Sequence, residues 1–165
     1  MIKIKKIVFF ILIILVLPIK VNAEIKDGLF ATVGNKAITK SDIVDEIKII
    51  LILNNQSYSD DKREQLQSAA VKSVVKRSIK KSEIEKYSLL EFSKNDLNNE
   101  LKRIAYNLNL DLETLKNIFA SNGLDFFLIE DQITTELLWN SLIFQLYKDR
   151  LRINKDEIDD QLKLI

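Results

Sequence analysis

The sequence of 165 residues contains no cysteine and no histidine. Without cysteine no disulfide can form, so the folded chain has to be stabilised by an apolar core. The two absences also exclude a zinc site of the usual Cys/His kind, a cysteine nucleophile and a histidine general base. Few classes of enzyme remain, and we expect no cofactor and no bound metal.

Glycine and proline are scarce, with three glycines and one proline. Because sharp turns depend on these residues, their scarcity favours long helices. One tight turn is nevertheless predicted, since the apolar run Leu29–Val33 ends at Gly34-Asn35 and Ala37-Ile38 resumes it. Glycine and asparagine both tolerate positive φ, so this stretch predicts a short β-hairpin.

Helix starts are marked by side chains that accept hydrogen bonds from the first helical turn. Thr39 and Asp42 have the spacing of a capping box, with aspartate in place of glutamate. Further starts are predicted near Ser59 and at Ser93, Asp111, Asp125 and Asn154. The pattern predicts a mainly α domain of about six helices around a long central helix, with one small N-terminal β-hairpin.

The helix predicted from Asp125 to about Leu151 is apolar over far more than the roughly 100° of an ordinary amphipathic helix. Either it is the central helix, packed on several sides, or part of its surface contacts something outside the chain. We expect Ile133, Leu137 and Leu151 to lie in the core. Part of a second set is expected to be accessible: Phe126, Phe127, Trp139 and Phe144.

The first 23 residues are typical of a secretory signal peptide. Three lysines precede the apolar run Ile7–Leu17, and the small residue Ala23 stands before Glu24. A membrane anchor is the alternative, but a spanning helix needs roughly 20 apolar residues and this run ends at Pro18. We therefore expect cleavage between Ala23 and Glu24, one domain over residues 24–165, and no stable membrane insertion afterwards.

The charge balance argues against a nucleic-acid partner. The predicted signal peptide holds four of the 25 basic residues and none of the 24 acidic ones, so the remaining chain has 21 basic and 24 acidic residues, a net charge of −3. No basic surplus remains to neutralise phosphate groups.

No motif indicates a catalytic site. The paired acids Asp60-Asp61, Asp156-Glu157 and Asp159-Asp160 stand beside predicted helix starts or on polar faces, and the helix dipole favours acids near a start. Ser73–Lys76 fits S-x-x-K, but it lies within a predicted helix and its partner motifs are missing. We expect no catalytic residue.

The order of the elements carries more information than any one of them. A signal peptide, a short strand, a Gly-Asn-Lys turn and AITKSDI (37–43) opening a helix come first. A short helix around Leu112–Leu115, the step Gly123-Leu124-Asp125 before a long helix, and the segment Arg150–Leu162 follow. In this order the elements resemble the N-terminal domain of SurA-type periplasmic chaperones, over nearly the whole chain after residue 23.

The resemblance implies that the protein is located in the periplasm and binds extended apolar and aromatic segments of unfolded outer-membrane proteins. By this binding the protein would assist their folding and assembly. The candidate client-binding residues are Phe126, Phe127, Trp139 and Phe144. It also implies parvulin-type prolyl isomerase domains after Ile165, where this sequence ends, so we expect a chaperone module without isomerase activity. The hairpin is expected to hold the start of the first helix, or else to offer a strand edge to clients.

The sequence leaves two alternatives open. In the first, the chain is a fragment of a parvulin-containing prolyl isomerase. In the second, it is a scaffold subunit that associates with itself, for example as a homodimer.

Overall fold

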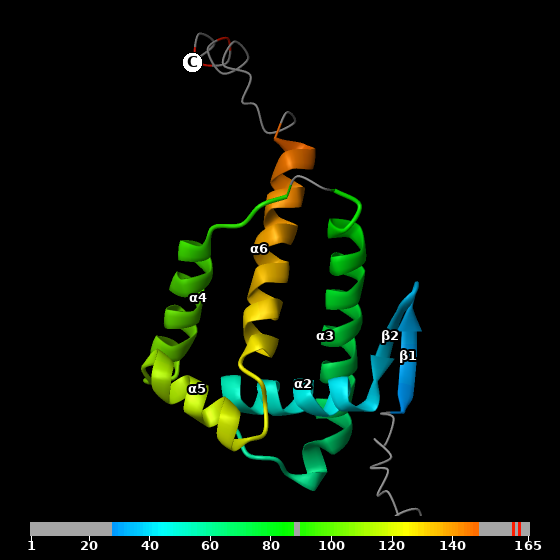
Figure 1. The fold of residues 1–165 in the computed structure, drawn as a ribbon, viewed down its shortest axis with the longest axis vertical. Coiled ribbons are helices and arrows are strands. Elements are labelled where there is room, and N and C mark those ends of the chain that lie inside the picture. Colours follow the sequence, from blue (N-terminus) through cyan, green and yellow to red (C-terminus); the bar gives the residue numbers. More distant parts are fainter. Residues whose placement is uncertain (1–27, 88–89, 149–159, 161, 163–165) are drawn as a thin grey trace, which may run out of the picture.

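The computed structural model describes residues 28–87 and 90–148, together with 160 and 162. Within them the chain forms a two-stranded hairpin and five α-helices (Figure 1). The elements are β1 (Leu29–Val33), β2 (Lys36–Thr39), α2 (Lys40–Leu53), α3 (Arg63–Ile84), α4 (Lys94–Asn107), α5 (Leu112–Ser121) and α6 (Phe127–Tyr147), with a short 3₁₀ helix (Asp60–Lys62) before α3. The prediction of a mainly α domain with one small N-terminal hairpin is confirmed.

The predicted number of helices is wrong for this part of the chain, which has five rather than about six. The sixth was expected from Asn154, and most of that segment lies outside the described residues. Asp160 and Leu162 are described and are helical, but both side chains are exposed.

The hairpin leads directly into α2. Val33 and Lys36 pair across a two-residue turn in which Gly34 has a φ of +60°, a conformation that glycine adopts without strain. The capping box is present, because the Asp42 backbone N–H donates to Thr39 Oγ1 at 3.2 Å and the Thr39 N–H donates to Asp42 Oδ2 at 2.7 Å. Two donors at the strand-to-helix junction are thereby satisfied.

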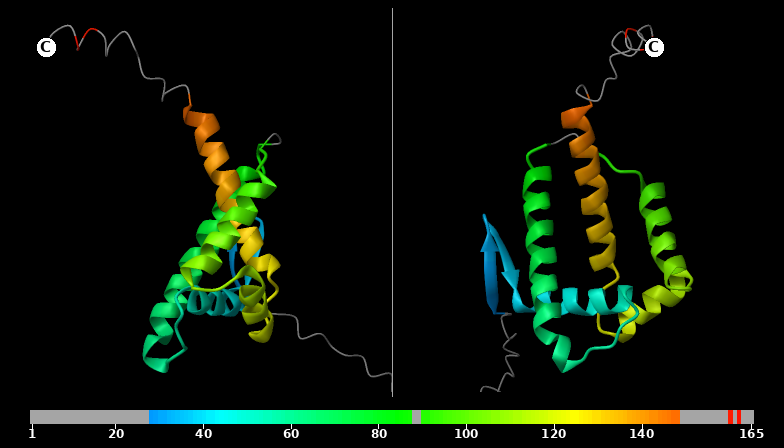
Figure 2. Two further views of the ribbon diagram at one scale, coloured as in Figure 1. Left: turned by 90° about the vertical axis from the view of Figure 1, so that its left-hand side faces the viewer. Right: turned by 180° about the vertical axis from the view of Figure 1, so that it is seen from behind.

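Helix α6 lies between α3 and α4, while α2 crosses this layer near one end with α5 beside it (Figure 1). The view from behind shows the same order, with the hairpin on the outer side of α3 (Figure 2). The C-terminal turns of α6 extend beyond the neighbouring ends of α3 and α4 (Figures 1 and 2). Helix α6 is therefore central along most of its length but not at its C-terminal end.

Two apolar clusters form the core. The larger joins α2, α4, α5 and α6, and its buried members are Ile49, Leu101, Ala105, Leu115, Phe119, Leu124, Ile129 and Ile133. The smaller joins β2 to α2 and α3 through Ile38, Ile43, Ala70 and Val74. Because Ile38 is buried in this second cluster, the hairpin is anchored in the core beside the start of α2, as its first predicted role requires.

Candidate functional site

An apolar groove follows one face of α2, and we refer to it as the α2 groove. Val44, Ile47 and Leu51 line it at helical spacing, and Phe30 and Tyr58 complete its apolar walls. The groove has a volume of about 590 Å³. Most of its lining surface is apolar.

The groove exists because α2 is apolar on two faces. Ile43 and Ile49 are buried in the two core clusters, whereas Val44 remains 51 % exposed. A helix that is apolar around most of its circumference becomes fully buried only when neighbours cover every side. The core elements cover one face of α2, and the other face is left as the floor of the groove.

The walls come from an irregular strand and from a connection between helices. The register of the hairpin shifts between Leu29 and Ala31, and such a bulge leaves one residue unpaired and redirects its side chain. The residue at the shift is Phe30, which lines the groove and is 40 % exposed. Tyr58, in the connection between α2 and the 3₁₀ helix, is 52 % exposed. Neither residue was singled out from the sequence.

Three cationic residues also line the α2 groove, and no acidic residue does. Lys48 is held in place, because its Nζ donates to the backbone oxygen of Asn122 at 3.0 Å, just after α5. Lys40 and Arg63 are exposed and form no ion pair with another described residue. The groove therefore joins an apolar floor to two cations that have no counter-charge in the described part of the chain.

The structure does not bring the four predicted client-binding residues together. Phe126 is half-buried, with its ring edge-on to that of Phe119 at 5.3 Å between centroids. Trp139 is also half-buried, and Lys80 Nζ lies 5.6 Å from the centre of its ring. Both aromatic rings are therefore engaged within the fold.

The other two predicted residues are exposed but far apart. Phe127 is 62 % exposed and Phe144 is 64 % exposed. They lie at opposite ends of α6, about 25 Å apart at a rise of roughly 1.5 Å per residue. The two exposed members of the predicted set therefore lie on separate parts of the surface.

Exposure along α6 depends on position along its axis as well as on its faces. Ile133 is buried and Leu137 is half-buried, as expected of core residues, while Leu151 lies outside the described residues. Beyond Leu142, which is buried, the apolar side chains are exposed: Ile143, Phe144, Leu146 and Tyr147. These residues lie in the last turns of α6. No helix in the described part of the chain is long and apolar enough to span a membrane.

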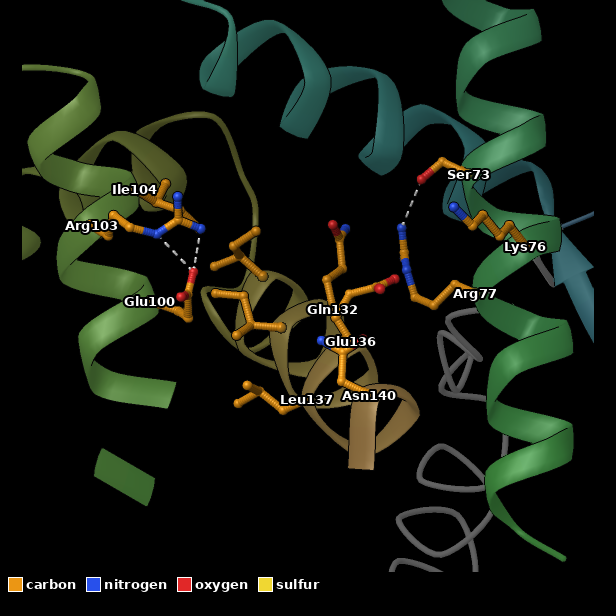
Figure 3. A pocket seen from close by; sticks show the side chains of 12 residues that line it. Ser73, Lys76, Arg77, Glu100, Arg103, Ile104, Gln132, Glu136, Leu137 and Asn140 are labelled. Atoms are coloured by element: carbon orange, nitrogen blue, oxygen red, sulfur yellow. Dashed lines mark hydrogen bonds and ion pairs between the residues drawn. The ribbon is translucent and has the colours of Figure 1, made fainter. Parts of the chain in front are cut away.

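A second pocket, between α3, α4 and α6, is charged (Figure 3). Its volume is about 490 Å³. Arg103 Nε donates to Glu100 Oε2 at 3.0 Å, and this bond raises the pKa of the arginine. On the opposite side of the pocket Arg77 Nη2 donates to Ser73 Oγ at 3.4 Å (Figure 3). The described residues contain no group of three acidic side chains placed to hold a metal ion.

The most unusual buried group is Glu46, whose side chain is 4 % exposed. Ser73 Oγ donates to its Oε1 at 2.5 Å, Gln132 Nε2 donates to its Oε2 at 3.0 Å, and Arg77 pairs with the same carboxylate. One carboxylate thus joins α2, α3 and α6. The sequence held a signal for it, because Glu46 stands three residues from both Ile43 and Ile49 on the inward face of the helix.

A buried lysine was also missed from the sequence. Lys80 of α3 is buried, whereas its apolar neighbour Ile79 is exposed. Lys80 pairs with Glu136 of α6 and lies over the Trp139 ring. Its long aliphatic stem can pack on apolar surface while its ammonium group is paired, which a helical-wheel pattern does not register.

The chain was compared with protein-family models, with curated proteins and with solved structures, and it matches none of them.

Proposed function

We propose that this protein is a periplasmic chaperone that reversibly binds extended apolar and aromatic segments of unfolded outer-membrane proteins and keeps them from aggregating. The observation that carries the proposal is the α2 groove, which leaves a concave apolar surface beside a well-filled core. In this proposal the protein assists folding by binding alone, without a cofactor and without isomerase activity.

The size and lining of the groove support this function. Pockets of roughly 300–1,000 Å³ with apolar and aromatic walls are typical binding sites. The α2 groove falls in this range at about 590 Å³, and its partly exposed members come from the hairpin, α2 and the following connection. Large apolar side chains of an unfolded chain fit such a surface, and their burial there removes them from water.

The strand edge beside the groove offers a second mode of contact. In the described part of the chain the sheet has two strands, so β1 has only β2 as a strand neighbour. An extended segment can add to such an edge through backbone hydrogen bonds while its side chains enter an adjacent pocket. Phe30 belongs to both β1 and the groove, which places the two surfaces next to each other.

The function is tested by replacing the most exposed groove residues. We expect the double variant Val44→Gln/Tyr58→Ser to suppress the aggregation of an unfolded β-barrel protein severalfold less well than the unchanged protein, measured by light scattering. Both positions are about half exposed, so the thermal unfolding temperature should change little.

The matched control is Phe144→Ser, which removes an exposed aromatic side chain at the far end of α6. We expect it to leave the suppression of aggregation unchanged. If Phe144→Ser abolishes suppression and the double variant does not, clients bind at the end of α6 instead of the α2 groove. If neither the unchanged protein nor any of the variants suppresses aggregation, the proposed chaperone function is wrong.

Export is tested separately. We expect the protein recovered from the periplasmic fraction to begin at Glu24, because a signal peptidase requires a small residue such as Ala23 before the cut. N-terminal sequencing measures this, and Ala23→Arg, which blocks cleavage, is the control. Recovery of the unchanged protein in the membrane pellet with an intact N-terminus would contradict the proposal.

A further inference from the structure

We propose that the α2 groove selects extended peptide segments in which a large apolar side chain is flanked by aspartate or glutamate. This inference rests on the proposed function and names the class of segment that the groove prefers. The observation behind it is the charge of the lining, since the groove has cationic residues and no acidic one.

The two cations without an ion-pair partner among the described residues stand on different elements. Lys40 is the first residue of α2, and Arg63 is the first residue of α3. Both are exposed, and both line the same groove as Val44 and Leu51. Asp60 and Asp61 precede Arg63 in the 3₁₀ helix but do not line the groove. A carboxylate beside a bound apolar side chain would therefore meet positive charge without an acidic neighbour in the lining.

Lys48 differs from the other two cationic residues of the groove, because its charge is partly matched within the fold. Its ammonium group donates to Asn122 O and lies 3.8 Å from Asp45 Oδ1, so part of its charge is already matched. Lys40 and Arg63 have no such partner among the described residues. Complementary charges around an apolar centre contribute chiefly to specificity and to the rate of association. The groove should therefore prefer apolar segments with acidic neighbours over apolar segments with basic neighbours.

The test uses three blocked peptides with the same Leu-Phe-Tyr centre, flanked on each side by two aspartates, two serines or two lysines. Binding to the purified protein is measured by fluorescence anisotropy. At low salt we expect the aspartate peptide to bind at least about fivefold more tightly than the lysine peptide, with the serine peptide between them. The difference should shrink in 0.15 M salt, where the Debye length falls to about 8 Å.

Two charge-reversed variants separate the groove from the charge of the whole protein. Lys40→Glu/Arg63→Glu should reverse the preference, so that the lysine peptide binds best. Lys72→Glu/Lys102→Glu changes the net charge equally at exposed positions of α3 and α4 outside the groove, and it should keep the original preference. Circular dichroism establishes that both variants are folded.

The outcomes distinguish this inference from the proposed function. If all three peptides bind equally and Val44→Gln/Tyr58→Ser weakens each of them, the groove binds clients but the charge preference is wrong. If both charge-reversed variants change the order of peptide affinities equally, the inference is also wrong, because the net charge of the protein would then explain the preference. If no peptide binds but laurate does, the occupant is a free anionic lipid and the inference fails. If neither a peptide nor laurate binds, the inference fails, and the proposed function fails with it only if the protein also does not suppress aggregation.

Discussion

Replacing Glu46 with alanine is expected to lower the free energy of unfolding by about 3–5 kcal/mol, because it leaves the half-buried partner Arg77 without its counter-charge. Ser73 and Gln132 lose their acceptor in the same change. The carboxylate joins α2, α3 and α6, so its loss affects contacts among all three helices. Urea denaturation followed by circular dichroism measures the effect.

Two further variants make the expectation specific. Glu85→Ala removes a carboxylate that pairs with Lys36 at the surface, and it should cost less than about 1 kcal/mol. In Glu46→Ala/Arg77→Ala both members of the pair are gone, so the loss should be smaller than the sum of the two single losses. Additive losses would show that Glu46 and Arg77 are not coupled in solution.

The second large effect is expected for Phe119→Ala, which should cost about 3–5 kcal/mol. Phe119 is fully buried in the larger core cluster, and its ring meets that of Phe126. Removing the ring leaves a cavity among α2, α5 and α6 that the surrounding side chains fill only in part. Thermal and urea unfolding should both show the loss.

Phe127→Ala is the matched control for this change. It removes the same side chain from a position eight residues further along the chain that is 62 % exposed. Because an exposed ring loses little on truncation, its effect should stay within about 0.5 kcal/mol. Equal losses of stability for the two variants would mean that Phe119 is not buried in the larger core cluster.

Local signals in the sequence predicted the start of most elements. Thr39, Ser93 and Asp111 each accept a hydrogen bond from the helical turn that they were expected to cap. Asp125 was expected to cap α6, but the N-cap is Phe126. Asp125 stands one residue earlier, and its Oδ1 accepts a hydrogen bond from the Phe127 N–H at 2.8 Å. Gly123, just after the C-cap of α5, has a φ of +68°, a conformation that glycine adopts without strain. These features depend on side chains only a few residues apart, so a sequence pattern is sufficient to find them.

The candidate site could be predicted only in part. The reasoning that a very wide apolar helix surface signals a binding face was applied to α6, and it selected two engaged rings and two distant ones. The same reasoning applied to α2 would have found Val44, Ile47 and Leu51. It could not have found Phe30 or Tyr58, because a bulge and a connection between helices bring them to the groove.

The sequence by itself determined the helical class, the hairpin, the capped helix starts and the absence of cysteine and histidine chemistry. The tertiary structure decided which apolar faces are covered. It buried Glu46 and Lys80 by supplying partners on other helices, and it left Val44 and Phe144 exposed because no described element covers them. The physical reason is that capping and turns are interactions between neighbours in sequence, whereas burial is a relation between segments that only the folded chain brings together.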